Sequence, residues 1–91
     1  MADRRHPDEL LSFPCCYEFK AFGLAADESF AETVRQAVCR VVPVGQEALR
    51  TRASSNGTYQ CVTVLVRLEN SAQLTGIYAM LRDVDGLRYL L

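Results

Sequence analysis

The chain has 91 residues, of which 49% are hydrophobic and 23% are charged, with a formal net charge of −1 at pH 7. This composition is typical of one soluble globular domain and excludes a disordered or strongly basic chain. No apolar run approaches the roughly 20 residues that cross a bilayer, and the N-terminus lacks an apolar signal core. We therefore expect a cytoplasmic protein with no membrane partner, and total charge gives no reason to expect nucleic-acid binding.

Residues 1–12 form a polar segment with a short helical turn expected near residues 7–11, and a single domain is expected to occupy residues 13–91. The domain opens with a strand over residues 16–23, because Tyr17 and Phe19 alternate with charged neighbours at the period of a half-buried strand. Gly23 ends this strand. No repeat, low-complexity segment or linker interrupts the chain.

A helix is expected next, over residues 29–42. Ser29 and Glu32 have the spacing of a capping box, and apolar residues recur behind them at helical intervals until Pro43. A strand over residues 49–54 then leads into a tight turn, where Gly57 can take the positive φ that a hairpin needs.

The strongest strand signal lies at residues 58–68, where β-branched residues alternate along the run. Asn70 and Gln73 predict the cap of a second helix, which residues 83–86 close, and "LRYLL" predicts a final strand. The resulting order is βαββαβ. It predicts an α+β ferredoxin-like sandwich, with a four-stranded antiparallel sheet and two helices on one face.

Right-handed crossovers place the first and third strands in the middle of this sheet and leave its other face open to solvent or to a partner. Tyr17, Phe19 and the valines of the third strand are expected to face the helices. The open face is expected to carry Lys20, Phe22, Tyr59, Thr63 and Arg67.

One end of the sheet should bring distant stretches together. Because the first and third strands are antiparallel, Lys20 to Gly23 should lie beside Tyr59, next to the hairpin of residues 54–57. Such a corner offers hydroxyls, free turn amides and a lysine over an aromatic ring, which suit a small anion or a partner's backbone. The alternative for each residue alone is turn geometry for the glycines and serines and a solvated side chain for the lysine.

Several known uses of this fold have local signatures that the chain lacks. The loop "GLAADES" has neither the C-x-x-C of a metal-delivery domain nor the arginine of an acylphosphatase-like enzyme. An RNA-recognition motif needs outward aromatic residues, and Tyr59 fits this pattern whereas Cys61 and Val64 do not. His6 lies in the polar segment without a placed partner, so neither a His/Cys dyad nor a zinc site is predicted.

The four cysteines are expected to be free thiols, because nothing indicates secretion. Cys39 and Cys61 fall inside apolar patterns and are interpreted as small packing residues. Cys15 and Cys16 are adjacent at the strand entrance, with no third ligand, base or thiolate-stabilising neighbour visible in the sequence. We therefore predict no metal, no cofactor and no catalytic residue.

Four arginines could line the open face as a modest basic stripe, namely Arg50, Arg52, Arg67 and Arg88. Glu18 and Glu69 interrupt this stripe, so we interpret these charges as a scattered solvated face. Nucleic-acid binding is not the leading expectation.

Two motifs resemble the YbeD family of small bacterial proteins of unknown function: "LLSFP" leading to "KAFG", and "SSNGTY" at the start of the strongest strand. The resemblance covers residues 10–91 and implies a ferredoxin-like fold similar to the ACT regulatory domains, which usually bind ligands at dimer interfaces near the loop after the first strand. Genes of the family often lie near those of lipoate attachment, which implies a regulatory or accessory role there. Residue by residue, the resemblance singles out Phe13, Pro14, Lys20, Gly23, Ser54, Ser55, Gly57 and Tyr59 and carries no catalytic residue.

These observations predict a non-enzymatic regulatory or interaction module. The fold alone does not determine its function. It is expected to bind a small-molecule effector or a protein partner, with a homodimer through the sheet and a link to lipoate metabolism as implied arrangements. The predicted binding residues are Lys20, Gly23, Ser54, Ser55, Gly57 and Tyr59. An RNA-binding domain on the same face is the alternative, and an enzyme that uses a cysteine is a third hypothesis.

Overall fold

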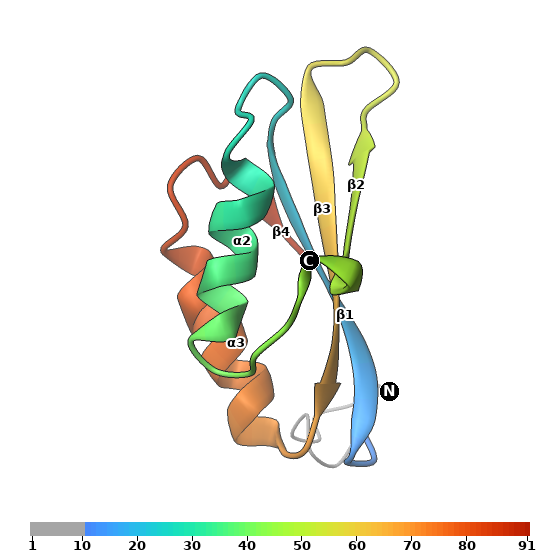
Figure 1. Ribbon diagram of the computed structural model, residues 1–91, viewed down its shortest axis with the longest axis vertical. Helices are drawn as coiled ribbons and strands as arrows, with labels where there is room; N and C mark the ends of the chain where they lie inside the picture. Colours follow the sequence, from blue (N-terminus) through green and yellow to red (C-terminus); the bar gives the residue numbers. More distant parts are fainter. Residues whose placement is uncertain (1–10) are drawn as a thin grey trace, which may run out of the picture.

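The computed structural model describes residues 11–91, and Figure 1 shows two helices on one side of a four-stranded sheet. The strands are β1 (Cys15–Leu24), β2 (Leu49–Ala53), β3 (Tyr59–Leu68) and β4 (Tyr89–Leu90). The helices are α2 (Phe30–Cys39) and α3 (Ser71–Arg82), and a 3₁₀ turn, η1 (Gln46–Ala48), precedes β2. His6 and the helical turn predicted near residues 7–11 lie outside the described residues, apart from Leu11.

The sheet has the strand order β2-β3-β1-β4, and all neighbouring strands are antiparallel. This arrangement confirms the predicted ferredoxin-like βαββαβ sandwich with β1 and β3 in its centre. These two strands pair along their whole length, from Cys15 opposite Leu68 to Leu24 opposite Tyr59. The register therefore fixes which side chains share each face of the sheet.

The core lies between the sheet and the two helices and follows the predicted alternation. The strands bury Phe19 and Ala21 of β1 together with Val62, Val64, Val66 and Leu68 of β3. The helices bury Phe30, Val34, Val38, Leu74, Ile77 and Leu81. Each large apolar side chain contributes about 1.5–3 kcal/mol when fully buried, and a one-residue slip of β3 would expose four of them.

Tyr17 and Tyr78 join β1 to α3 at the edge of this core. Their hydroxyl oxygens are 2.8 Å apart, and both rings pack edge-on against Phe19. Burial first, and then the hydrogen bond with Tyr17, raises the pKa of Tyr78. Tyr78 therefore stays neutral, and the hydrogen bond satisfies both hydroxyls inside an apolar contact.

The capping box predicted at the start of α2 does not form. Ser29 precedes the helix in a right-handed conformation (φ −91°, ψ −4°), and its side chain makes no cap bond. Its amide and its hydroxyl both donate to Asp27 Oδ1, at 3.2 and 3.0 Å. The helix ends at Cys39, short of the predicted residue 42, because Pro43 has no amide to donate and disfavours a helical residue before it.

Glu32, the other residue of the predicted capping box, anchors the connection from α2 to β2 instead. Arg35 donates to its two carboxylate oxygens at 2.9 and 2.6 Å, and Gln46 of η1 donates to Oε1 at 2.8 Å. The bond from Arg35, followed by that from Gln46, lowers the pKa of Glu32 to about 2. Arg35 Nη1 also donates to the carbonyl of Val44 at 3.0 Å, so this cluster holds the segment that leads into β2.

The cap predicted for α3 is confirmed, and Gln73 adds a second bond to the residue before the cap. Asn70 Oδ1 accepts the amide of Gln73 at 2.9 Å, while Gln73 Oε1 accepts the amide of Glu69 at 2.7 Å.

Gly57 has the positive φ expected of the hairpin turn, at 76°. None of the helices within residues 11–91 has the length and apolar character needed to cross a membrane.

Candidate functional site

The outer face, defined as the side of the sheet away from α2 and α3, gathers the exposed apolar side chains of the described residues. Five large apolar side chains are exposed within residues 11–91: Leu24, Tyr59, Leu65, Tyr89 and Leu91. Strand register places Leu24 opposite Tyr59, and Tyr89 opposite Phe22, on this face. Leu65 pairs with Glu18 there, and Leu91 lies beside Lys20. Apolar side chains concentrated on one uncovered face are typical of a recognition surface.

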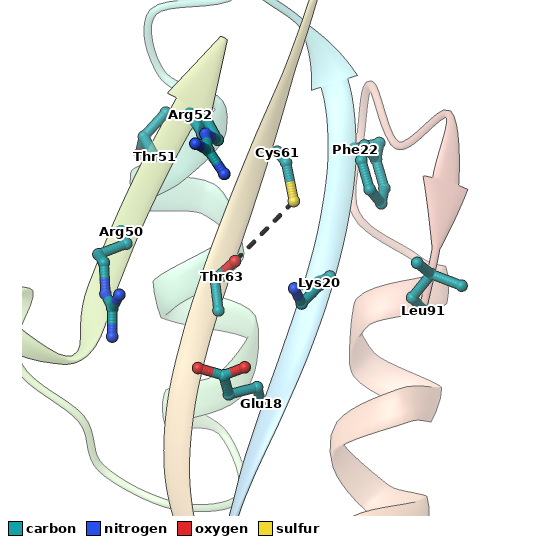
Figure 2. Close-up of a pocket in the computed structure, with 9 residues that line it drawn as sticks. All are labelled: Glu18, Lys20, Phe22, Arg50, Thr51, Arg52, Cys61, Thr63 and Leu91. Atoms are coloured by element: carbon teal, nitrogen blue, oxygen red, sulfur yellow. Dashed lines mark hydrogen bonds between the residues drawn. The ribbon is translucent and has the colours of Figure 1, made fainter. Parts of the chain in front are cut away.

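The charged part of this face is the cationic row, which consists of Arg50, Thr63 and Lys20. Thr63 of β3 is in register with Lys20 of β1 on one side and with Arg50 of β2 on the other. Figure 2 shows Lys20 and Arg50 on the two sides of Thr63, with Glu18 at one end of the hollow. Across the part of the chain that the structure describes, no ion pair engages either of these two cations.

The cationic row lines a hollow of about 720 Å³ on the outer face. The lining residues are Glu18, Lys20, Phe22, Arg50, Thr51, Arg52, Cys61, Thr63 and Leu91. Three cations and one carboxylate therefore line the hollow. The hollow combines positive charge, a hydroxyl and apolar surface, which are the elements of a small-molecule site.

Towards the hairpin, the same face becomes apolar. The middle row consists of Arg52, Cys61, Phe22 and Tyr89, which stand in register across all four strands. The corner row lies beyond it, with Tyr59 opposite Leu24. A second hollow of about 180 Å³ lies between these rows, lined by Phe22, Arg52, Ala53, Ser54, Tyr59, Gln60 and Cys61. It shares three lining residues with the larger hollow, so the two hollows adjoin.

The hairpin turn uses its own polar groups, so the expectation of free turn amides is wrong for four of them, those of Ser54, Gly57, Thr58 and Tyr59. Ser54 Oγ accepts the amide of Tyr59 at 3.1 Å, and its carbonyl accepts the amide of Gly57 at 2.9 Å. Asn56 Oδ1 accepts the amide of Thr58 at 3.2 Å and the hydroxyl of Ser54 at 2.9 Å. These bonds shape the turn and fix the start of β3.

The structure brings together only part of the predicted set of site residues. Lys20 and Tyr59 lie on the outer face, whereas Ser54, Ser55 and Gly57 lie in the turn that borders it. Gly23 is buried on the other side of β1, towards the helices. A Cβ atom at Gly23 would lie 2.8 Å from the ring of Phe30, so this glycine allows α2 to approach the strand.

Gln60 is a structural residue of the corner that sequence reasoning does not identify. Gln60 is 8% exposed and lies on the helix side of β3. Nε2 donates to the carbonyls of Leu24 and Asp27, at 2.8 and 2.9 Å. Gln60 therefore fastens the loop after β1 to the start of β3. A polar residue at an inward position of an otherwise apolar strand is the signal that could have revealed it.

Phe22, Arg50 and Arg52 are the other members of the site that motif reasoning leaves out. The sequence interpretation treats both arginines as part of a scattered charged surface. The register instead sets Arg50 beside Thr63 and Arg52 beside Cys61, in two adjacent rows. Strand alternation around Thr63 could have found this grouping once the pairing of β2 with β3 was assumed.

All four cysteines are free, as predicted. Cys15 and Cys16 are successive residues of β1, so their side chains leave opposite faces of the sheet and cannot share one ligand. Cys39 Sγ donates to the carbonyl of Val44 at 3.3 Å and accepts its amide at 3.4 Å. Within residues 11–91, no group of three or more metal-ligating side chains is brought together.

Comparison with known proteins finds sequence relatives along most of the chain. The model of the family described as "Protein of unknown function (DUF493)" matches residues 8–91. A UPF0250 protein of Shewanella sediminis is 34% identical over 84 residues, which cover 92% of this chain and 93% of the relative. The UPF0250 protein IL0958 of Idiomarina loihiensis has the same identity and coverage, and a UPF0250 protein of Shewanella piezotolerans is 36% identical over the same lengths.

Among solved structures, the chain is similar to the solution structure of protein HP0495 from H. pylori. The TM-score is 0.65, and the match covers 98% of each chain at 15% sequence identity. At this identity the likeness concerns the fold alone. It agrees with the sheet and helix arrangement described above.

Proposed function

The chain belongs to the DUF493 family, which is the UPF0250 or YbeD family that its two motifs resemble, and we propose that it is a non-enzymatic regulatory or interaction module. It binds a small ligand or a protein partner through the outer face and the adjoining hairpin corner. The family is one of unknown function, so the proposal rests on the chemistry of this face.

The observation that carries the proposal is the placement of the exposed apolar side chains. Tyr59 is 44% exposed and Tyr89 is 60% exposed, although a folded chain gains free energy by burying such rings. Strand register puts both on the outer face. On the same face, Lys20, Arg50 and Arg52 have no ion pair inside the described part of the chain. Binding of a ligand or partner there would remove apolar area from water at about 25 cal/mol for each Å².

A homodimer through the sheet and a partner from lipoate metabolism are the finer versions of this proposal. The first would cover the outer face with a second copy, and the second follows from the gene neighbourhood implied by the YbeD resemblance. Each predicts a different occupant of the same surface. Both therefore belong in the same binding screen.

RNA binding is a second candidate, and the aromatic side chains of the outer face favour it. Phe22 of β1 and Tyr59 of β3 both belong to this face, where an RNA-recognition domain carries its stacking rings. The two functions differ in their response to salt. Phosphate contacts make the affinity for RNA fall steeply as salt is added, whereas an apolar contact changes little.

The test is an amide chemical-shift perturbation screen of the whole chain against metabolites, lipoyl carrier domains, short RNA and the chain itself at increasing concentration. We expect one class to perturb residues 20–22, 50–53 and 59–63. Tyr59→Ser should abolish or weaken that effect, and Ser71→Ala, on the far side of the molecule at the start of α3, should leave it unchanged. Perturbation confined to α2 and α3 would refute the proposal.

The non-enzymatic part needs its own experiment, because a thiol reaction is the competing hypothesis. Replacing Cys15, Cys16 and Cys39, which line neither hollow, with serine should leave binding on the outer face intact. Loss of binding in this variant, with the circular dichroism spectrum unchanged, would instead support chemistry that depends on a cysteine.

A further inference from the structure

The outer face changes from charged to apolar along its strands. The cationic row comes first, Phe22 and Cys61 of the middle row come next, and Tyr59 of the corner row follows. Neighbouring rows on one face are two residues apart along each strand, or about 6.6 Å. A molecule that reaches from the cationic row to the corner row therefore spans about 13 Å.

The cationic row suits one anionic head group. Lys20 and Arg50 flank Thr63, so two positive charges stand on the two sides of a hydroxyl. Lysine and arginine form charge-assisted hydrogen bonds with a carboxylate or phosphate, and the hydroxyl of threonine adds a neutral donor. Arg52 stands one row further and adds a third positive charge.

The middle and corner rows suit an apolar or planar body. The rings of Phe22 and Tyr89 have centroids 5.9 Å apart and are tilted by 56°, which leaves ring surface for a further contact. Tyr59 and Ala53 continue this surface through the smaller hollow. The apolar part begins directly beside the cations, so a single molecule can use both.

The charge distribution decides among possible occupants. A second copy would bring a hollow with three cations and one carboxylate against another of the same sign, and like charges across an interface are unfavourable. A nucleic-acid strand needs positive charge along its whole track, but Glu18 stands in the next row beyond Lys20. The formal net charge of −1 gives a polyanion no further attraction.

We propose that the outer-face hollow binds a small organic anion with an apolar or aromatic body. The head group lies between Lys20 and Arg50, and the body lies over Phe22 towards Tyr59. This assignment rests on the proposed function, because it names the ligand class for the same site. The head group is a carboxylate or a phosphate monoester, which share this recognition chemistry.

The test is an NMR titration of the whole chain with matched probes. The anions 4-phenylbutyrate and phenyl phosphate represent the two head groups. The alcohol 4-phenyl-1-butanol keeps the aromatic body without charge, and butyrate keeps the charge with little body. We expect at least one aromatic anion to perturb residues 20–22, 50–52 and 59–63 and to bind at least about tenfold more tightly than the alcohol or butyrate.

Variants on the same face separate the head contact from the body contact. Lys20→Gln and Arg50→Gln should each weaken the aromatic anion about tenfold. Arg67→Gln is the matched control, because Arg67 is exposed at the far end of β3 and pairs with Glu69. Phe22→Ala should weaken the aromatic anion and leave butyrate unchanged. Circular dichroism checks that each variant is folded.

Equal binding of the alcohol and the aromatic anions would overturn the proposal, as would anion binding that is unchanged in Lys20→Gln and Arg50→Gln. Binding of an oligouridylate with steep salt dependence, and of no small anion, would favour RNA instead. If an uncharged ligand or a protein perturbs this face and the anions do not, the ligand class is wrong and the proposed function stands. If no probe perturbs the outer face, the ligand class and the proposed function are both wrong.

Discussion

Gly23→Ala tests whether this glycine serves packing or binding. In the structure, a Cβ atom at residue 23 would lie 2.8 Å from Cε1 and Cζ of Phe30 and 2.9 Å from Cδ1. Carbon atoms in favourable contact are about 3.5–4.0 Å apart, so the ring or the strand would have to move by roughly 1 Å. Phe30 is 1% exposed and closely packed, which makes that movement costly.

The expected net effect is a modest loss of stability. Overpacking of this kind costs about 1–3 kcal/mol. Gly23 has no positive φ, so alanine also gains roughly 0.5–1 kcal/mol over glycine in a strand. The free energy of unfolding should therefore fall by roughly 1 kcal/mol, the difference between the middles of these two ranges, and the melting temperature by about 4–8 °C.

Urea unfolding measures this effect, and Gly76→Ala is the matched control. A Cβ atom at Gly76, inside α3, would lie 3.5 Å from Val41, an ordinary contact, so alanine there should stabilise by about 0.5–1 kcal/mol. Combining Gly23→Ala with Phe30→Leu should reduce the penalty and give a coupling energy of about 0.5–2 kcal/mol. A Gly23→Ala variant as stable as the parent, or one without coupling to Phe30, would refute the packing role.

Three further predictions concern groups outside the hollow. Gln60→Met should lower the free energy of unfolding by about 1–3 kcal/mol and speed hydrogen exchange at residues 25–29, because two backbone carbonyls each lose one of their two donors and keep only a backbone amide. The exposed Gln36→Met should do neither. Asn70→Ala should cost about 1 kcal/mol in urea unfolding, with Ser71→Ala nearly neutral. The folded pKa of Glu32, about 2, lies below its ordinary 4.5, so its stabilisation is complete above pH 4.5 and is lost as pH falls towards 2. Urea midpoints of the parent and of Glu32→Gln should therefore differ at pH 6 and converge near pH 2; a constant difference would contradict this.

Local patterns in the sequence predict most of the fold. The alternation around Phe19 and Val64 gives the two central strands and their buried faces, because a strand with one buried face must repeat every second residue. The Asn70 cap is also predictable, since its partner lies three residues away. Both features depend only on residues that are close to one another in the sequence.

Features that depend on distant partners are not predictable in the same way. Glu32 leaves the predicted capping box because Gln46, fourteen residues later, and Arg35 offer stronger hydrogen bonds. The role of Gln60 needs the carbonyls of Leu24 and Asp27, which approach only when β1 and β3 pair. The cationic row likewise exists only through the strand register, which joins three strands that the motifs do not relate.

Lys20 and Gly23, the first and last residues of "KAFG", have different roles because of their spacing along β1. Residues three apart on a strand leave opposite faces, so Lys20 faces the hollow whereas Gly23 faces Phe30. They cannot act as one site. Gly23→Ala should therefore lower stability and leave the affinity of the folded chain for an aromatic anion unchanged. Lys20→Gln should lower that affinity and leave stability unchanged. A loss of affinity in Gly23→Ala under conditions where it is fully folded would show that the inner face contributes to binding.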